Sequence, residues 1–315
     1  TDCRQTQPPV HGCVEACLSE PGRRRGGGTV VAFVVVGCIC SAGAAAANKL
    51  APLNLTGKSV VFARSLLGLV VCLAVHALTK QSLRPRRPSA VVARGGCAVA
   101  CLLAYYHAIR AGGLDLGAGA LLVRLSVLWV ALASRATLGE AVSLRSAILA
   151  VSGLLGVSLA MSPQSSQSLS GPGLALLASV ALAASNLLSR ALTADHSPLL
   201  ITTYMMLVGA LVAVPTSTDE VLAMCEPGGI VCLGAAAFLG VLAQLSVIAA
   251  LGRQSAVPVS LGAFAEVAFS IALSALLFRT APPLLVVMGG AIAMASGLLA
   301  VGPPPHESER CGAEL

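Results

Sequence analysis

The sequence predicts an all-α integral membrane protein with ten transmembrane helices, arranged as two inverted five-helix repeats. Three observations lead to this fold class: the composition, a series of apolar segments, and a repeat in their pattern. Of the 315 residues, 56% are hydrophobic and 10% are charged, whereas about a quarter of the residues of a soluble globular domain are charged. This composition excludes a soluble enzyme.

Apolar runs bounded by Gly, Pro and charged residues divide the chain into ten predicted spans. Each has close to the roughly 20 residues that a helix needs to cross a bilayer. The predicted spans are 29–47, 59–79, 91–109, 116–134, 142–161, 171–189, 197–215, 228–251, 256–278 and 283–301. The segments 228–251 and 256–278 lie close together, but they are too long to form one span. Ten helices leave no room for a soluble catalytic domain.

Both ends of the chain, residues 1–28 and 302–315, are predicted to be disordered tails. The N-terminal segment begins with Thr1 rather than Met, which indicates a processed or truncated product, and it has no hydrophobic periodicity. Gly302 and the prolines after it stop the last helix. The tail has Cys and His residues whose spacing matches no zinc pattern, so we predict no metal site and no cofactor. These residues are Cys3, His11, Cys13 and Cys17.

The basic residues predict the orientation of the chain. If successive spans cross the membrane in alternating directions, 14 of the 20 Lys and Arg residues lie on the side of the N-terminus and 4 on the other side. The remaining 2 lie within spans. The larger group includes Arg94, assigned to the basic loop that begins at Lys80. Because cytoplasmic loops are enriched in Lys and Arg, both termini are predicted to be cytoplasmic. The membrane is either the plasma membrane or an internal one.

The chain shows a repeat at an offset of 140 residues, which places 114–161 over 254–301. The evidence for the repeat is the shared hydropathy pattern of helix, polar break and helix, because the number of identical residues alone is near chance. An odd number of helices in each half would invert the second copy relative to the first, as in many transporters. We therefore predict a first repeat at 29–161, a linker at 162–170 and a second repeat at 171–301.

Short motifs in both halves resemble the EamA-type domain of the drug/metabolite transporter superfamily. The first half contains Tyr105-Tyr106-His107-Ala108-Ile109, Thr137-Leu138-Gly139-Glu140 and a small-residue helix with Gly153 and Gly156. The second half contains Ala265-Glu266-Val267 and Leu277-Phe278-Arg279-Thr280. The resemblance covers nearly all of 29–301, and Arg64 lies where that family often carries an arginine. It implies a membrane transporter.

The sequence also resembles one branch of solute carriers, and it departs from the superfamily pattern at three positions. Arg94-Gly95 before the third span and the Tyr-Tyr pair near its end are similar to the acyl-malonyl-condensing-enzyme-like branch of solute carrier family 35. Three positions depart from the superfamily pattern: Val127 and Val267 replace a usual proline, and Thr280 replaces a usual glutamate. A kink in the fourth and ninth spans therefore does not follow from the resemblance.

Three charged residues within predicted spans are candidates for a function, because a charge at mid-span costs roughly 2.5 to 3.5 kcal/mol on insertion scales. Arg124 and Glu266 are near the centres of the fourth and ninth spans, and the repeat offset places them at similar depth. In one interpretation, Arg124 and Arg64 bind an anionic group of a substrate while Glu266 is a gate, proton carrier or counter-ion. In the other, Arg124 and Glu266 only neutralise each other, and Arg64 extends to the membrane interface.

Other polar and aromatic residues could complete a binding pocket. Tyr204 and Gln244 lie well inside their spans and are the better candidates, whereas Tyr105 fits an interface anchor near a helix end. The remaining candidates are Lys49, Tyr106 and His107. Stripes of small residues at every fourth position in the first and last spans predict close helix packing. They are Gly37, Ser41 and Ala45 in the first span and Gly289, Ala293 and Gly297 in the last.

Motifs of hydrolases, metalloproteases and phosphate-binding loops are not found in the sequence, which predicts that the protein is not an enzyme. The function that the sequence favours is secondary-active transport of a small polar, anionic organic metabolite around a midplane cavity. A membrane channel and a non-transporting membrane scaffold are the alternatives. The predicted partners are the metabolite, the lipid bilayer and a coupling ion or proton; nucleic acid is not among them.

Overall fold

A computed structural model describes residues 27–51, 55–110, 122–140, 142–160, 170–215, 217–279 and 282–302. Within these ranges the secondary structure is helical and contains no strand, which confirms the all-α fold class. The predicted tails lie outside the described residues, apart from Gly27 and Gly28 at the start of the first helix and Gly302 after the last.

The helices follow one another along the chain with short connections. They are α2 (Gly27–Leu50), α3 (Gly57–Thr79), α4 (Pro88–Arg110), α6 (Ser126–Leu138), α7 (Leu144–Ala160), α8 (Ser170–Leu192), α9 (Pro198–Val212), α10 (Thr218–Cys225), α11 (Pro227–Leu251), α12 (Ala256–Gly262), α13 (Ala265–Phe278) and α14 (Leu284–Val301). Among the described residues, 7 segments are long and apolar enough to cross a membrane, and α12 and α13 together form one of them. Apolar helices at 144–159 and 198–212 are shorter.

Local chemistry sets several of the helix ends. Thr56 and Ser197 are N-caps whose hydroxyl groups accept hydrogen bonds from the backbone N–H groups of Ser59 and Leu200, and such caps satisfy donors that a helix leaves free. Gly139 ends α6 with a φ of 68° and donates its N–H to the carbonyl group of Arg135. Glycine adopts this left-handed conformation without steric cost.

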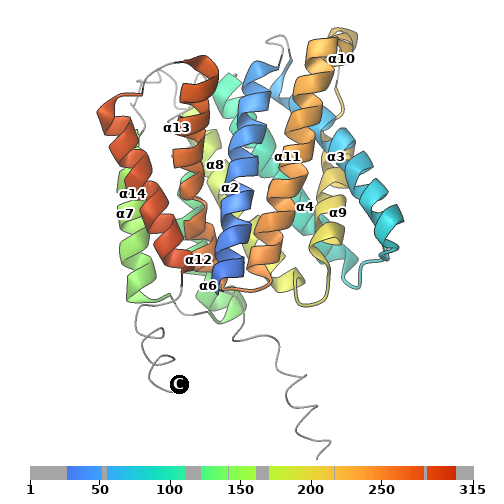
Figure 1. Cartoon of the computed structure of the whole chain (residues 1–315). Helices are drawn as coiled ribbons and strands as arrows, with labels where there is room; N and C mark the ends of the chain where they lie inside the picture. The colour runs from blue at the N-terminus through green and yellow to red at the C-terminus, as the bar shows by residue number, and fades with distance from the viewer. Residues whose placement is uncertain are drawn as a thin grey trace, which may run out of the picture.

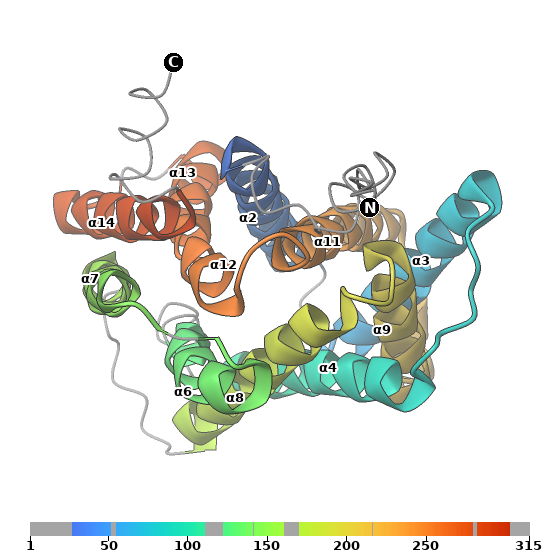
Figure 2. The ribbon, with the colours of Figure 1, turned by 90° about the horizontal axis from the view of Figure 1, so that it is seen from below.

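The helices form a bundle in which two rows face each other. Seen from below (Figure 2), α12, α2 and α11 lie on one side and α6, α8, α4 and α9 on the other, with α7 and α14 at one edge and α3 at the opposite edge. α2 packs against α11, and α4 packs against α8. We call the end of the bundle at which α2 begins and α14 ends the terminal face, at the bottom of Figure 1, and the other end the opposite face.

The helix bounds repeat with the predicted offset of 140. α7 begins at Leu144 and α14 at Leu284, and α6 and α13 end one residue before Gly139 and Arg279. Gly139 and Arg279 both have positive φ, at 68° and 50°. The two halves therefore share their helix ends although their sequences show almost no identity.

Both corresponding spans are interrupted. In the first half, residues 122–124 form a helical turn that Leu125 separates from α6. In the second half, Ala263 and Phe264 separate α12 from α13, and their N–H groups donate to carbonyl groups three residues earlier. Phe264 is fully buried and packs against Gly153 of α7, where a larger residue would clash. Both interruptions thus contain hydrogen bonds between residues three apart, and Val127 and Val267 stand where the superfamily pattern has a proline.

The predicted small-residue stripes do bring helices close together. A Cβ atom on Gly156 of α7 would lie 2.6 Å from the backbone nitrogen of Ala293 and 2.8 Å from the carbonyl oxygen of Gly289. A Cβ atom on Gly297 would lie 2.9 Å from the carbonyl oxygen of Leu261. Small side chains allow such backbone approaches between membrane helices, so α14 packs tightly against both α7 and α12.

Candidate functional site

The two central charges predicted from the sequence form an ion pair. Nη2 of Arg124 lies 2.8 Å from Oε2 of Glu266, and the two side chains are 14% and 20% exposed. Each charge adjoins a helix interruption: Arg124 directly precedes Leu125, and Glu266 lies in the first turn of α13. The positive end of a helix dipole is at its N-terminus, where it favours a carboxylate. The interruptions therefore bring opposite charges from the two halves together inside the bundle.

Side chains from two other helices lie near this ion pair. Cys38 of α2 and Tyr105 of α4 lie close enough to Arg124 and Glu266 for both charges to act on them. The thiol of Cys38 also lies 3.6 Å from the carbonyl oxygen of Gly262. The sequence interpretation of Tyr105 as an interface anchor is therefore wrong. Tyr105 lies four residues after Cys101 on α4, one helical turn away, and Cys101 is in turn within electrostatic range of Arg124.

Arg64 is buried in the bundle, and none of the described carboxylates pairs with it. Its residue is 9% exposed, and its Nε atom has no hydrogen-bond partner. The guanidinium group lies over Gly240 of α11, where a Cβ atom would be 2.6 Å from both Nε and Nη2. Arg64 and Arg124 are both within electrostatic range of Cys101. The side chain thus points into the bundle rather than to the membrane interface.

The sequence interpretation missed a third interior arginine, Arg94. Assigned to a cytoplasmic loop, it instead lies in the second turn of α4 and is 2% exposed. Its Nε donates to Oγ of Ser189 at 2.8 Å, its Nη2 donates to Oε1 of Gln244 at 2.9 Å, and its Nη1 has no partner. The predicted span 91–109 already contains Arg94, and Pro88, a residue favoured at the first position of a helix, extends the helix further before it.

The other predicted site residues are dispersed. Gln244 contacts Arg94, whereas the hydroxyl of Tyr204 donates to the carbonyl oxygen of Leu83 in the loop before α4. The hydroxyl of Tyr106 accepts a hydrogen bond from Nδ2 of Asn48 at 2.7 Å. His107 is exposed, and the side chain of Lys49 lies outside the described part of the structure. The structure thus groups Arg124 with Glu266 and Gln244 with Arg94, whereas the hydroxyl groups of Tyr204 and Tyr106 bond to other residues.

Polar contacts join the two halves at the terminal face. Glu140, in the loop after α6, accepts hydrogen bonds from Nε of Arg190 at 2.9 Å and from the backbone nitrogen of Ala256 at 2.8 Å. Arg190 also donates to the carbonyl oxygen of Leu251. One carboxylate therefore connects the α6–α7 loop with α8 and with the start of α12. At the opposite face, Ser59 of α3 hydrogen-bonds to the carboxylate of Glu220 in α10.

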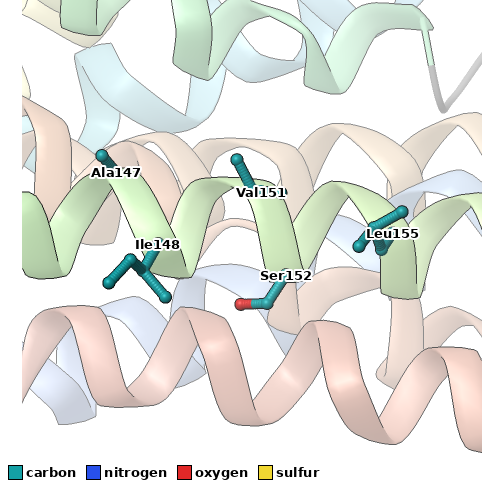
Figure 3. Close-up of a pocket in the computed structure, with 5 residues that line it drawn as sticks. All are labelled: Ala147, Ile148, Val151, Ser152 and Leu155. Atoms are coloured by element: carbon teal, nitrogen blue, oxygen red, sulfur yellow. The ribbon is translucent and has the colours of Figure 1, made fainter.

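Two hollows in the described structure are lined by uncharged residues and not by the arginines and glutamates described above. One, of about 400 Å³, is lined by α7 residues alone (Figure 3). Its residues Ile148, Val151 and Leu155 are more than half exposed, and Ser152 turns toward α14, where its hydroxyl meets that of Ser296. The other, of about 330 Å³, lies between α2, α3, α9 and α11 and includes Phe33 and Leu199. The apolar exposed surface of the first suits contact with lipid.

Among the described residues, no group of three His, Cys, Asp or Glu side chains is placed to hold a metal ion. The four Cys and His residues of the N-terminal segment considered above lie outside the described ranges. The chemistry that the described interior offers is therefore that of guanidinium groups, one carboxylate, and neutral hydrogen-bonding groups.

Comparison with known proteins gives a family and a fold. Residues 28–162 and 169–302 each match the EamA-like transporter family. A solved structure, described only as "Crystal structure of protein", superposes with a TM-score of 0.68 at 18% sequence identity, over 90% of this chain and 98% of that chain. A search of curated proteins found no match. At this identity the solved structure supports the fold alone.

Proposed function

Because the chain belongs to the EamA-like transporter family, we propose that it is a secondary-active transporter of a small polar, anionic organic metabolite. It works by alternating access around a site at the level of Arg124 and Glu266. The family consists of membrane transporters of small molecules, and the apolar helices make this chain a multi-pass integral membrane protein. The metabolite and the bilayer are its partners, and a coupling ion or proton drives the cycle.

The proposal rests on the charge of the bundle interior. Arg64, Arg94 and Arg124 lie in the bundle, and the described part of the chain pairs only Arg124 with a carboxylate. Charged residues within a membrane are costly and mark substrate or ion paths. Two positive charges thus remain without a counter-ion, and an anion is the ligand that would neutralise them.

Glu266 has a specific role in this proposal. Its carboxylate holds Arg124 when no substrate is bound, and an incoming carboxylate or phosphate group displaces it. The pair sits where two helices are interrupted, and discontinuous helices form the midplane sites of many transporters. Freed from Arg124, Glu266 can take up a proton or a cation, which would couple substrate binding to ion movement.

The proposed membrane topology has ten spans in two inverted five-helix repeats. Residues 29–161 form the first repeat and residues 171–301 the second, joined by 162–170. Helix packing supports a two-fold relation between the halves, because contacts come in exchanged pairs: α2 with α11 and α8 with α4, or α11 with α3 and α4 with α9. Both termini are cytoplasmic in this proposal. Protease protection of tags at the two ends in sealed vesicles tests this, and opposite protection of the two tags would refute an even number of spans.

A thermal-shift screen tests the substrate class. The full chain and Arg124→Ala are compared against di- and tricarboxylates, phosphorylated sugars, amino acids and nucleotide sugars. A ligand that binds only the folded state raises its stability, so an anion should stabilise the wild-type protein and lose this effect in Arg124→Ala. Stabilisation by neutral or cationic compounds only, or an unchanged response in the variant, would mean that Arg124 is a structural partner of Glu266.

Counterflow in proteoliposomes then separates the transporter from the two alternatives. A carrier loaded with an unlabelled stabilising anion accumulates the labelled anion transiently above equilibrium. A channel gives flux without this overshoot, and a scaffold gives no flux.

A further inference from the structure

The Arg94 cluster, made of Arg94, Ser189 and Gln244, is a second polar centre inside the bundle. It joins three helices, because Arg94 belongs to α4, Ser189 to α8 and Gln244 to α11. Arg94 lies six residues after Pro88, or about 9 Å along α4, and Gln244 lies seven residues before the end of α11 at Leu251. The cluster is thus near the terminal face.

The hydrogen bonds of the cluster fix Arg94 but leave part of it free. Ser189 donates its hydroxyl proton to the carbonyl oxygen of Ser185 at 2.7 Å and accepts from Nε of Arg94. Oε1 of Gln244 accepts from Nη2. Nη1 of Arg94 is buried without a partner, and the amide nitrogen of Gln244 makes no hydrogen bond in the described structure. Two donor nitrogen atoms on adjacent side chains therefore remain available.

The charge of Arg94 is not compensated. The ion pairs of the described residues are Arg87 with Asp195, Arg124 with Glu266, and Arg190 with Glu140, so each partner of Arg94 is neutral. A buried ionised group without a counter-charge is strongly unfavourable. A guanidinium group with free N–H donors is well suited to bind a carboxylate or another oxyanion.

Arg94 also lies on the same side of α4 as the central site. Cys101 follows Arg94 by seven residues, or about two helical turns, and Cys101 is within electrostatic range of Arg124 and Arg64. The two centres are therefore separated by about 10 Å along α4. That distance is compatible with an anion passing from one to the other.

We propose that the Arg94 cluster is a second oxyanion site, which binds a carboxylate group of the transported metabolite between the central ion pair and the terminal face. This inference rests on the proposed function, since it takes the metabolite to be an anion. Nη1 of Arg94 and the amide of Gln244 donate to the carboxylate, and Ser189 orients the guanidinium group. The metabolite occupies this site when it enters or leaves through the terminal face.

The test measures stabilisation of the full chain by succinate, citrate and inorganic phosphate. The protein is held in maltoside detergent free of phospholipid, which removes lipid headgroups as a source of oxyanions, and chloride salts keep the ionic strength constant. The midpoint of thermal unfolding is followed against anion concentration for wild type, Arg94→Gln, Arg94→Lys and Arg124→Gln. Arg135→Gln, which removes an exposed arginine of α6, is the matched control for loss of charge.

We expect at least one anion to stabilise the wild-type protein. Arg94→Gln should raise the anion concentration needed for half of the shift by about tenfold or more, because it removes a charge-assisted hydrogen bond. Arg94→Lys should have an intermediate effect, since it keeps the charge but loses the fork of donors. Arg135→Gln should match wild type. Should Arg94→Gln fail to fold, Gln244→Leu takes its place and should weaken stabilisation in the same direction.

The outcomes separate this site from the central one. If no anion stabilises the wild type, or if Arg94→Gln (or Gln244→Leu) responds like wild type, the Arg94 site is overturned. An anion whose effect is lost in Arg124→Gln but kept in Arg94→Gln leaves the central site standing and removes the second one. An effect lost in Arg94→Gln but kept in Arg124→Gln supports the second site and refutes the role of Arg124.

Discussion

Arg124 and Arg94 are both buried arginines of one bundle, and they differ in what they face. Arg124 meets the carboxylate of Glu266 at 2.8 Å, whereas the partners of Arg94 among the described residues are the hydroxyl of Ser189 and the amide of Gln244. A carboxylate neutralises a guanidinium group, and neutral groups only solvate it. The bundle therefore has a charge-balanced centre, where an anion must displace Glu266 from Arg124, and an unbalanced centre, where an anion would neutralise the charge of Arg94.

Glu266→Gln converts the balanced centre into an unbalanced one and should have the largest effect on stability. Removing one partner of a buried ion pair typically costs about 3 to 5 kcal/mol, because the other charge stays buried and uncompensated. With the side chains 14% and 20% exposed, the lower end of that range is expected. Denaturant unfolding of the purified protein in mixed micelles measures the free energy of unfolding.

Two further variants make the Glu266 prediction specific. Asp195→Asn breaks the pair with Arg87, whose side chain is 63% exposed, and should cost less than about 1 kcal/mol, as exposed pairs do. Adding Arg124→Gln to Glu266→Gln should recover part of the lost stability, because no unpaired charge then remains. A double variant as unstable as the sum of its single variants would show that the pair does not act as a unit.

Arg94→Met tests the unbalanced centre. Its expected effect on the free energy of unfolding is opposite in sign to that of Glu266→Gln. The substitution removes the cost of burying an uncompensated charge, which outweighs the loss of the hydrogen bonds to Ser189 and Gln244. We therefore expect the free energy of unfolding to stay equal or rise, while stabilisation by added anions decreases. Both quantities come from the same unfolding titrations, with and without succinate. A loss of stability as large as that caused by Arg124→Met would instead assign Arg94 a structural role.

The sequence predicted the balanced centre more successfully than the unbalanced one. Arg124 and Glu266 lie inside long apolar segments, where a charge is conspicuous, and the repeat offset of 140 placed them at one depth. Arg94 follows a run of basic loop residues, so its charge looks like part of the loop. The predicted span 91–109 nevertheless contains Arg94, and the start of α4 at Pro88 places it in the second turn of the helix. Contacts such as those with Ser189 and Gln244 depend on packing between distant helices, which single-sequence patterns do not contain.

Helix ends show the same division between local and long-range causes. The predicted loop before 228 contains the short helix α10, and its signal was local: Ser217 as N-cap, followed by Asp219 and Glu220 in the first turn. By contrast, the interruption at Phe264 depends on Gly153, which is far away in the sequence. The proline pattern of the family could not reveal it, because Val267 replaces that proline.

Gly240→Ala should have a smaller effect than Glu266→Gln, and it concerns Arg64, the other buried arginine to which the described residues supply no carboxylate. A Cβ atom at position 240 would lie 2.6 Å from Nε and Nη2 of Arg64, so the guanidinium group must move. Overpacking of this kind costs about 1 to 3 kcal/mol, and the lower end is expected because the long arginine side chain can shift.

Gly234 provides the matched control for Gly240 on the same helix. A Cβ atom at Gly234 would meet nothing within 4 Å, so Gly234→Ala should be neutral or slightly stabilising, as alanine favours helix over glycine. If Arg64 contributes to the anion path, Gly240→Ala should also weaken stabilisation by succinate, and Gly234→Ala should not. Equal stabilisation of the two variants by succinate would show that Arg64 packs against α11 without taking part in anion binding. Arg94 would then be the unbalanced cation that binds the anion.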